Sequence, residues 1–221
     1  MVSLELRDIT FRYHGMKKPL FHGLSWFFTS GRLYVVYGDN GVGKTTLLKI
    51  IAGLLKPERG TVLLDGEDIY SDPRRYRRYI GLLFQNPEAM LFNPTVFDEI
   101  AFTPRQIYDE EKVRLVVERV VQRIGLDMEL LGIPPQRLSY GLKKLVALAS
   151  ILSYDPDIIL LDEPFTNLSE KYRRRVSMII DELVVGDKLI IIATHEVDRI
   201  KQYITSDPIL LRLDNGSLIP G

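Results

Sequence analysis

The side chains best suited to chemistry gather in residues 38–45, where glycines and polar residues precede a lysine and a threonine. This run reads Gly-Asp-Asn-Gly-Val-Gly-Lys-Thr and fits the pattern G-x-x-x-x-G-K-[ST]. The glycines allow successive backbone N–H groups to surround a phosphate without Cβ clashes. In this pattern the lysine reaches the β- and γ-phosphates, and the threonine gives its hydroxyl to Mg²⁺. The run therefore predicts a nucleotide-binding loop rather than an ordinary turn, with contacts from Gly38, Asn40, Gly41, Gly43, Lys44, Thr45 and Thr46.

Two carboxylates form a second candidate site. Asp162 and Glu163 directly follow the apolar run 158–161, which predicts a buried strand. Ligands bind at the carboxyl ends of strands in an open parallel sheet, so these side chains are well placed. Asp162 is suited to hold Mg²⁺, and Glu163 to orient or deprotonate an attacking water. The alternative is a solvated strand end before Pro164.

Gln85 and His195 follow the ends of two further predicted strands, 80–84 and 188–193. The imidazole of His195 either donates to a γ-phosphate oxygen or has a purely structural role. The amide of Gln85 either bridges Mg²⁺ and the attacking water or caps its strand. The residue types alone leave both questions open.

These residues need a framework of strands and helices to bring them together. The apolar run 33–37 predicts a strand buried on both faces, and residues 44–54 predict a helix with Leu47, Leu48, Ile51 and Leu54 or Leu55 on one face. Strands at 157–161 and 188–193 flank a predicted helix at 170–183. Because strands alternate with helices, we expect an α/β fold with a parallel sheet.

The remaining segments have different patterns. Residues 3–13 alternate with a one-residue slip, which predicts a strand with a bulge, and residues 24–28 and 61–64 predict further strands. The segment 86–152 lacks buried-strand runs, which predicts a mostly helical insertion within a single domain of residues 1–221. The dipeptide Asn215-Gly216 predicts the turn of a terminal hairpin.

Composition excludes several classes of protein. The 29 Lys and Arg residues balance 29 Asp and Glu residues, so we expect no nucleic-acid partner. The absence of cysteine excludes disulfides and thiolate metal sites. No apolar run is long enough to span a membrane, and the N-terminus does not resemble a signal peptide. We therefore expect a soluble, cytoplasmic protein that meets a membrane only through a partner.

Taken in order along the chain, these residues resemble the ATP-binding-cassette (ABC) ATPase family. The resemblance covers nearly the whole chain and implies a RecA-like P-loop NTPase core with an antiparallel β subdomain and an inserted helical subdomain. It implies that Tyr13 stacks on adenine, that Thr45, Gln85 and Asp162 serve Mg²⁺, and that Glu163, His195 and Gln85 are catalytic. The run 138–142, Leu-Ser-Tyr-Gly-Leu, occupies the position of the family signature. It implies that Ser139 and Gly141 contact the ATP of a second cassette.

A narrower resemblance lies in the run Phe-Gln-Asn-Pro-Glu at 84–88 and in the segments that follow it up to residue 102. They are similar to the cobalt-type and energy-coupling-factor group, which drives uptake of vitamins and metal ions. This resemblance implies a peripheral subunit on the cytoplasmic face of the cell membrane. It also implies that apolar residues of 86–102, with Leu91 and Phe92 as candidates, receive a coupling helix of a transmembrane partner.

The departures from the family fall on the residues offered to a second cassette. The usual signature is Leu-Ser-Gly-Gly-Gln, whereas Tyr140 and Leu142 stand here for the first Gly and the Gln. Ser169 replaces a usual Asp, and Leu145 a usual Arg. A bulky Tyr140 is expected to hinder approach to the partner's γ-phosphate. We therefore expect a heterodimer of cassettes with one full and one weak site, rather than a homodimer.

Two other functions compete with this interpretation. One is an ABC ATPase that acts on cytosolic complexes or DNA and not in transport. The other is a regulatory subunit that binds ATP and barely hydrolyses it, which the altered signature favours and the presence of Glu163 and His195 opposes.

Overall fold

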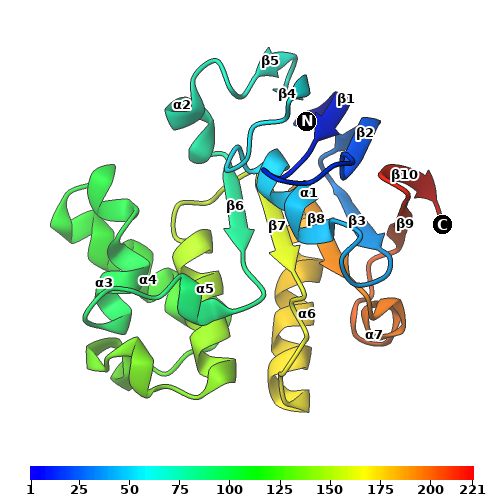
Figure 1. Cartoon of the computed structure of the whole chain (residues 1–221). Coiled ribbons are helices and arrows are strands. Elements are labelled where there is room, and N and C mark those ends of the chain that lie inside the picture. The colour runs from blue at the N-terminus through cyan, green and yellow to red at the C-terminus, as the bar shows by residue number, and fades with distance from the viewer.

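The computed structural model describes residues 1–221, and its strands form two sheets (Figure 1). The first sheet has four antiparallel strands in the order β2-β1-β4-β5. The second has six strands in the order β10-β9-β3-β8-β7-β6, in which every neighbouring pair except β10 and β9 is parallel. The strands are β1 (Ser3–Phe11), β2 (Phe21–Thr29), β3 (Arg32–Tyr37), β4 (Arg59–Leu64), β5 (Glu67–Asp68), β6 (Ile80–Leu83), β7 (Ile158–Asp162), β8 (Leu189–Thr194), β9 (Pro208–Asp214) and β10 (Ser217–Pro220).

Helices cover both faces of the six-stranded sheet. The α-helices are α1 (Lys44–Ile51), α2 (Pro73–Arg77), α3 (Val96–Ala101), α4 (Glu110–Ile124), α5 (Tyr140–Leu152), α6 (Glu170–Val185) and α7 (Val197–Tyr203). Short 3₁₀ helices are η1 (Pro87–Ala89), η2 (Pro104–Gln106), η3 (Met128–Gly132) and η4 (Pro135–Arg137).

The six-stranded sheet separates two hydrophobic cores. In β3, Leu33 and Val35 belong to the core shared with α4, α5 and α6, while Tyr34 and Val36 belong to the core shared with α1 and the antiparallel sheet. Successive side chains of a strand point to opposite faces, so a strand buried on both sides must be apolar throughout. The predicted α/β fold with a parallel sheet is confirmed.

Two local predictions at the ends of the chain are also confirmed. The register of β1 against β2 shifts between Leu6 and Ile9, where Asp8 has a φ of 53°. The C-terminal strands β9 and β10 pair antiparallel across Asn215 and Gly216, both with positive φ, as a tight hairpin turn requires.

Between β6 and β7 the chain forms only helices and turns, from η1 to α5. Figure 1 places α3, α4 and α5 together on the β6 side of the sheet. The helices bury an apolar stripe that includes Val113, Val117 and Val121 of α4. That 86–152 acts as a subdomain within a single domain of residues 1–221 stays a prediction.

Two residues differ from expectation. Helix α1 ends at Ile51, so Leu54 and Leu55 both lie beyond it. Leu54 is exposed, whereas Leu55 is half-buried and packs against the core shared with α1. Leu91 is only 8% exposed and belongs to the core, whereas its neighbour Phe92 is 66% exposed. Leu91 is therefore not a surface residue of the segment 86–102, because the apolar helices of the insertion enclose it.

None of the helices combines the length and the apolar composition that crossing a membrane would require.

Candidate nucleotide site

The loop between β3 and α1 has the backbone conformation that its glycines predict. Gly41 and Gly43 have φ values of 84° and 109°. A Cβ on Gly43 would also lie 2.9 Å from the ring of Phe21. Gly43 caps α1 without a side-chain hydrogen bond, so the N–H groups of the first turn receive no side-chain cap. This helix end is therefore suited to an anion such as a phosphate.

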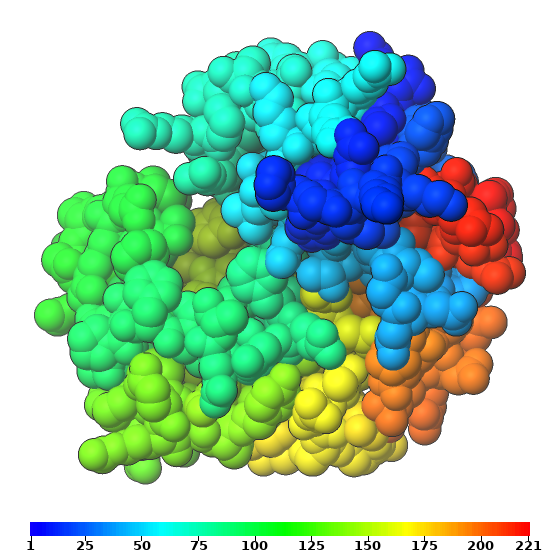
Figure 2. Space-filling model, in the orientation of Figure 1, coloured from blue at the N-terminus to red at the C-terminus, as the bar shows by residue number.

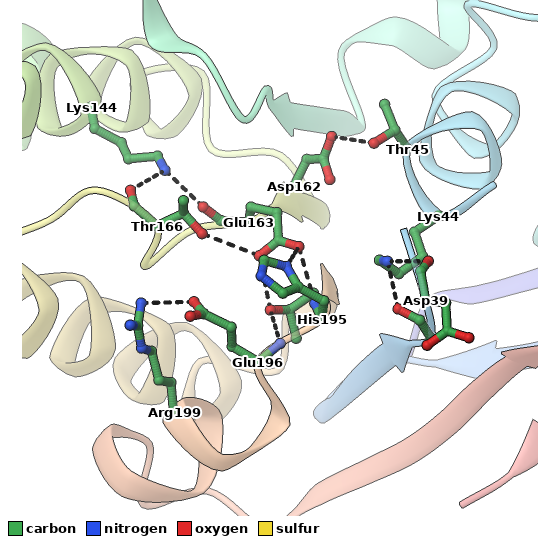
Figure 3. A network of polar contacts seen from close by, with 12 residues as sticks. Asp39, Lys44, Thr45, Lys144, Asp162, Glu163, Thr166, His195, Glu196 and Arg199 are labelled. Atoms are coloured by element: carbon green, nitrogen blue, oxygen red, sulfur yellow. Dashed lines mark hydrogen bonds and ion pairs between the residues drawn. The ribbon is translucent and has the colours of Figure 1, made fainter. Parts of the chain in front are cut away.

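Lys44 lies across this loop. Its Nζ donates to the backbone oxygens of Gly38 at 2.7 Å and Asp39 at 3.0 Å (Figure 3). Burial lowers the pKa of Lys44, and the nearby carboxylates of Glu163 and Asp162 oppose this shift. The ammonium group thus lies in a partly desolvated position, where its attraction to a phosphate is stronger than in water.

Thr45 and Asp162 bring two oxygen ligands together. The Thr45 hydroxyl donates to Asp162 Oδ2 at 2.7 Å, joining the start of α1 to the end of β7. Burial raises the pKa of Asp162, while the bond from Thr45 lowers it. A hydroxyl and a carboxylate fit Mg²⁺, which prefers oxygen ligands and is usually shared with phosphates and water. The chain has no group of three or more His, Cys, Asp or Glu residues that would hold a metal by itself.

Glu163 directly follows β7, and its backbone adopts the left-handed conformation, with a φ of 48°. Its carboxylate accepts hydrogen bonds from Thr194 Oγ1 at 2.9 Å and from the His195 backbone N–H at 3.0 Å. The Nδ1 of His195 lies 2.5 Å from Glu163 Oε1, and Thr166 Oγ1 donates to Oε2 at 3.2 Å (Figure 3). These contacts hold the carboxylate in one orientation and leave only Nε2 of His195 to reach a phosphate.

Most of the predicted site residues line one cavity of about 470 Å³. Tyr13 lies at this cavity, and its hydroxyl is 3.0 Å from Thr46 Oγ1. Gly38 lines a neighbouring cavity with Asn40 and His195. The residues that line the first cavity are Tyr13, Met16, Leu20, Asn40, Gly41, Gly43, Lys44, Thr45, Thr46, Gln85, Asp162, Glu163 and His195.

Ser139 and Gly141 lie apart from this cavity, at the start of α5. Ser139 is exposed and caps the helix through its hydroxyl, which accepts from the Leu142 N–H at 3.4 Å. Gly141 is buried, and a Cβ there would lie 2.3 Å from the ring of Tyr172. Close packing against Tyr172 therefore also favours a glycine at position 141. The expected contact of both residues with the ATP of a second chain stays a prediction.

Lys144 is a site residue that the sequence reasoning missed. It is only 1% exposed, and its Nζ donates to the backbone oxygens of Glu163 at 2.7 Å and Thr166 at 3.4 Å (Figure 3). Burial lowers its pKa to about 8. A lysine on the apolar face of α5, three positions after Gly141 and four before Leu148, is the signal that could have identified it.

We expect buried Lys144 to make stability depend on pH between about pH 8 and 10. Its pKa is about 8 in the folded chain and near 10.5 when exposed. The unfolded chain thus binds more protons in this interval, and the free energy of unfolding rises with pH, by about 2 kcal/mol from about pH 8 to 9.5. Lys144→Met should remove this rise. Urea denaturation at about pH 8 and about pH 9.5 measures the free energy of unfolding of the wild type and of Lys144→Met. An equal pH dependence in the two proteins would contradict the prediction.

Comparisons with known proteins identify the family to which the chain is similar. A family model described as "ABC transporter" matches residues 21–166. A putative ABC transporter ATP-binding protein of Pyrococcus furiosus is 39% identical, and the match covers 97% of this chain and 81% of that protein. The energy-coupling factor transporter ATP-binding protein EcfA1 of Thermotoga maritima is 35% identical, over 98% of this chain and 80% of its own.

A solved structure resembles the whole fold. The structure of cbiO1 from Clostridium perfringens, described as part of the ABC transporter complex cbiONQ, superposes with a TM-score of 0.84 at 29% identity. The match covers 98% of this chain and 86% of that chain.

Proposed function

Because this chain belongs to the ABC transporter family of ATPases, we propose that it powers an importer of a vitamin or a metal ion. Two similar proteins support this proposal, since one is named an energy-coupling factor transporter ATP-binding protein and the other is part of the complex cbiONQ. The expected place of the subunit is the cytoplasmic face of the membrane, held there by a transmembrane partner.

The catalytic proposal depends on one observation: the same cavity is lined by Lys44, Thr45, Asp162 and Glu163. We assign Lys44 to the β- and γ-phosphates of ATP, and Thr45 and Asp162 to Mg²⁺, with Gln85 as a further ligand. The bound ion would neutralise charge on the phosphate oxygens. Tyr13 is assigned to the adenine ring. Gly38, Asn40, Gly41, Gly43 and Thr46 are assigned to contacts with the nucleotide.

Glu163 is assigned to the attacking water. The carboxylate orients the water and accepts its proton as the water oxygen attacks the γ-phosphorus and the bond to ADP breaks. His195 supports the carboxylate through Nδ1 and presents Nε2 toward the γ-phosphate, while Gln85 completes the site. The separate bonds from Thr194 and Thr166 keep the carboxylate oriented, so little reorganisation is needed during the reaction.

Pairing with a different cassette is the second part of the proposal. The residues around the chain's own cavity match the family, while Tyr140, Leu142 and Ser169 depart from it. A homodimer would combine each intact cavity with an altered signature. A heterodimer would join this chain's cavity to the usual signature of its partner and form one full site.

The test is the rate of Mg-ATP hydrolysis by the purified chain over a wide range of protein concentration, alone and with a cassette of usual signature. Restored turnover only in the mixture supports the heterodimer. Specific activity that rises steeply with the concentration of this chain alone would show a competent homodimer and reject the heterodimer.

A candidate docking surface for the transmembrane partner lies beside Phe92. Its ring packs edge-on against exposed Phe102, with centroids 5.1 Å apart. Phe102 and exposed Ile107 line a cavity of about 830 Å³ that α2 closes from the other side. Figure 2 shows this surface hollowed between the α2 segment and the green helical region. Two carboxylates of the cavity, Asp155 and Asp157, pair with Lys188. Its arginines, Arg74, Arg77 and Arg78, form no ion pair within the chain, so we expect an apolar partner segment that also carries carboxylates.

We expect Phe92→Ser to abolish binding of the transmembrane partner while the thermal stability and ATP affinity of the isolated chain stay unchanged. Phe92 is exposed and supports no core packing, so its loss removes apolar contact area only at the proposed interface. Copurification with the transmembrane partner measures the effect.

Leu91→Ser is the matched comparison. Leu91 is buried in the core, so this change should lower the melting temperature by burying a hydroxyl and leaving a cavity. Full partner binding by Phe92→Ser would reject the docking surface.

A further inference from the structure

We propose that Tyr140 is a positioning residue for Gln85, and that it joins the signature of this chain to its own nucleotide cavity. This inference rests on the proposed roles of Gln85 and of the signature. It reverses the expectation that Tyr140 acts only as an obstacle to a partner's nucleotide.

The side chain of Tyr140 is directed at its own chain. Its hydroxyl donates to the backbone oxygen of Gln85 at 2.9 Å, linking residues 55 positions apart. The ring is half-buried and packs against the core of the helical segment. Burial raises the pKa of Tyr140, and a side-chain hydrogen bond with Asn167 opposes this shift, so the hydroxyl stays protonated and able to donate near neutral pH. A glycine at this position, as in the usual signature, has no side chain to make the bond.

A second contact comes from the same helical turn. The Nζ of Lys143 lies 2.5 Å from a carboxylate oxygen of Glu88, three residues beyond Gln85. The pair is partly exposed, and such pairs contribute little alone. Together, Tyr140 and Lys143 connect the first turn of α5 to both ends of the short segment 85–88.

Helix α5 also reaches the segment that follows β7. Lys144, four positions after Tyr140, donates to the backbone oxygen of Glu163, so two positions one turn apart on the same helix contact the segments that follow β6 and β7. Those segments carry Gln85 and Glu163, which both line the nucleotide cavity. Ser139, the exposed cap of the same helix, is one residue from Tyr140.

The consequence is a direct mechanical link. A shift of the Gln85 backbone when nucleotide enters the cavity must either break the bond to Tyr140 or carry the first turn of α5 with it. In the second case, Ser139 and Gly141 move as well. The state of this chain's own site would then set the position of the signature that it presents to the second cassette.

Tyr140→Phe is the first test because it removes only the hydroxyl. In the full chain, amide hydrogen exchange of the segment 84–90 should become several-fold faster, while exchange of the loop 38–45 stays unchanged and the melting temperature falls by no more than a few degrees, as loss of one hydrogen bond implies. Unchanged exchange at 84–90 would overturn the proposal without bearing on ATP hydrolysis.

The second test is a double-mutant cycle on hydrolysis, in the assembly whose wild-type form shows turnover. Tyr140→Phe should lower kcat about 3- to 10-fold, the effect of one hydrogen bond, with little change in KM. In the Gln85→Ala background the same change should have no further effect, because Tyr140 acts through Gln85. Independent, multiplying effects would overturn the proposal.

ATP hydrolysis by the wild-type protein distinguishes failure of the proposed function from failure of the role of Tyr140. Absence of hydrolysis in every wild-type assembly would reject the proposed function. Normal wild-type hydrolysis together with a Tyr140→Phe variant that matches it in kcat and in exchange would reject only the role of Tyr140.

Discussion

Glu163→Gln should lower the rate of ATP hydrolysis by about 10²- to 10⁴-fold, the usual contribution of a positioned general base. The amide keeps the size and some hydrogen bonds of the carboxylate but cannot accept the proton of the attacking water. Glu163 is buried and held by Thr194 and His195, so no neighbouring carboxylate can take its place without rearrangement. Phosphate release under saturating Mg-ATP measures the effect.

ATP affinity provides the internal check for Glu163→Gln. Binding of a labelled nucleotide should be retained, because Lys44 and the loop remain intact. Glu118→Gln on the exposed face of α4 is the matched control, since Glu118 forms no ion pair in the chain. Turnover that survives Glu163→Gln at the wild-type level would reject the assignment of Glu163.

Lys44→Ala should weaken ATP binding about 10- to 150-fold. This range corresponds to the loss of one hydrogen bond to a charged group, worth about 1.5–3 kcal/mol. The ammonium group lies over the loop, where it bonds to the oxygens of Gly38 and Asp39 and faces the cavity. Equilibrium titration with labelled ATP gives the affinity directly, and it does not require a partner cassette or hydrolysis.

Lys56→Ala is the control for charge. Lys56 is exposed, follows the same helix and lines none of the cavities described above. The substitution Lys56→Ala removes one positive charge from the chain and leaves the loop 38–45 unchanged, so ATP affinity should stay at the wild-type value. Equal weakening by the two substitutions would mean that general charge, and not the position of Lys44, governs binding.

Much of the site could be predicted because its geometry is local or follows from the sheet. Gly41 and Gly43 have positive φ angles, which glycine adopts without a steric cost, so the spacing of the glycines alone already indicates the loop. Asp162, Glu163 and His195 come together because parallel strands end at the same edge of a sheet. The apolar runs of β3, β7 and β8 reveal burial on both faces without knowledge of their neighbours.

Other features depended on contacts between distant segments. Leu91 and Phe92 are equally apolar, and only the packing of the insertion decides that one is buried and the other exposed. The bonds from Tyr140 to Gln85 and from Lys144 to Glu163 join residues 55 and 19 positions apart.

By itself, the sequence determined the α/β class, the loop conformation and the strand ends, because backbone preferences and side-chain periodicity act over a few residues. The tertiary structure alone decided which helix turn meets which loop, and therefore what Tyr140 and Lys144 contact. The physical reason is that such contacts depend on the orientation of whole elements. That orientation is set by how two hydrophobic cores pack against the same sheet.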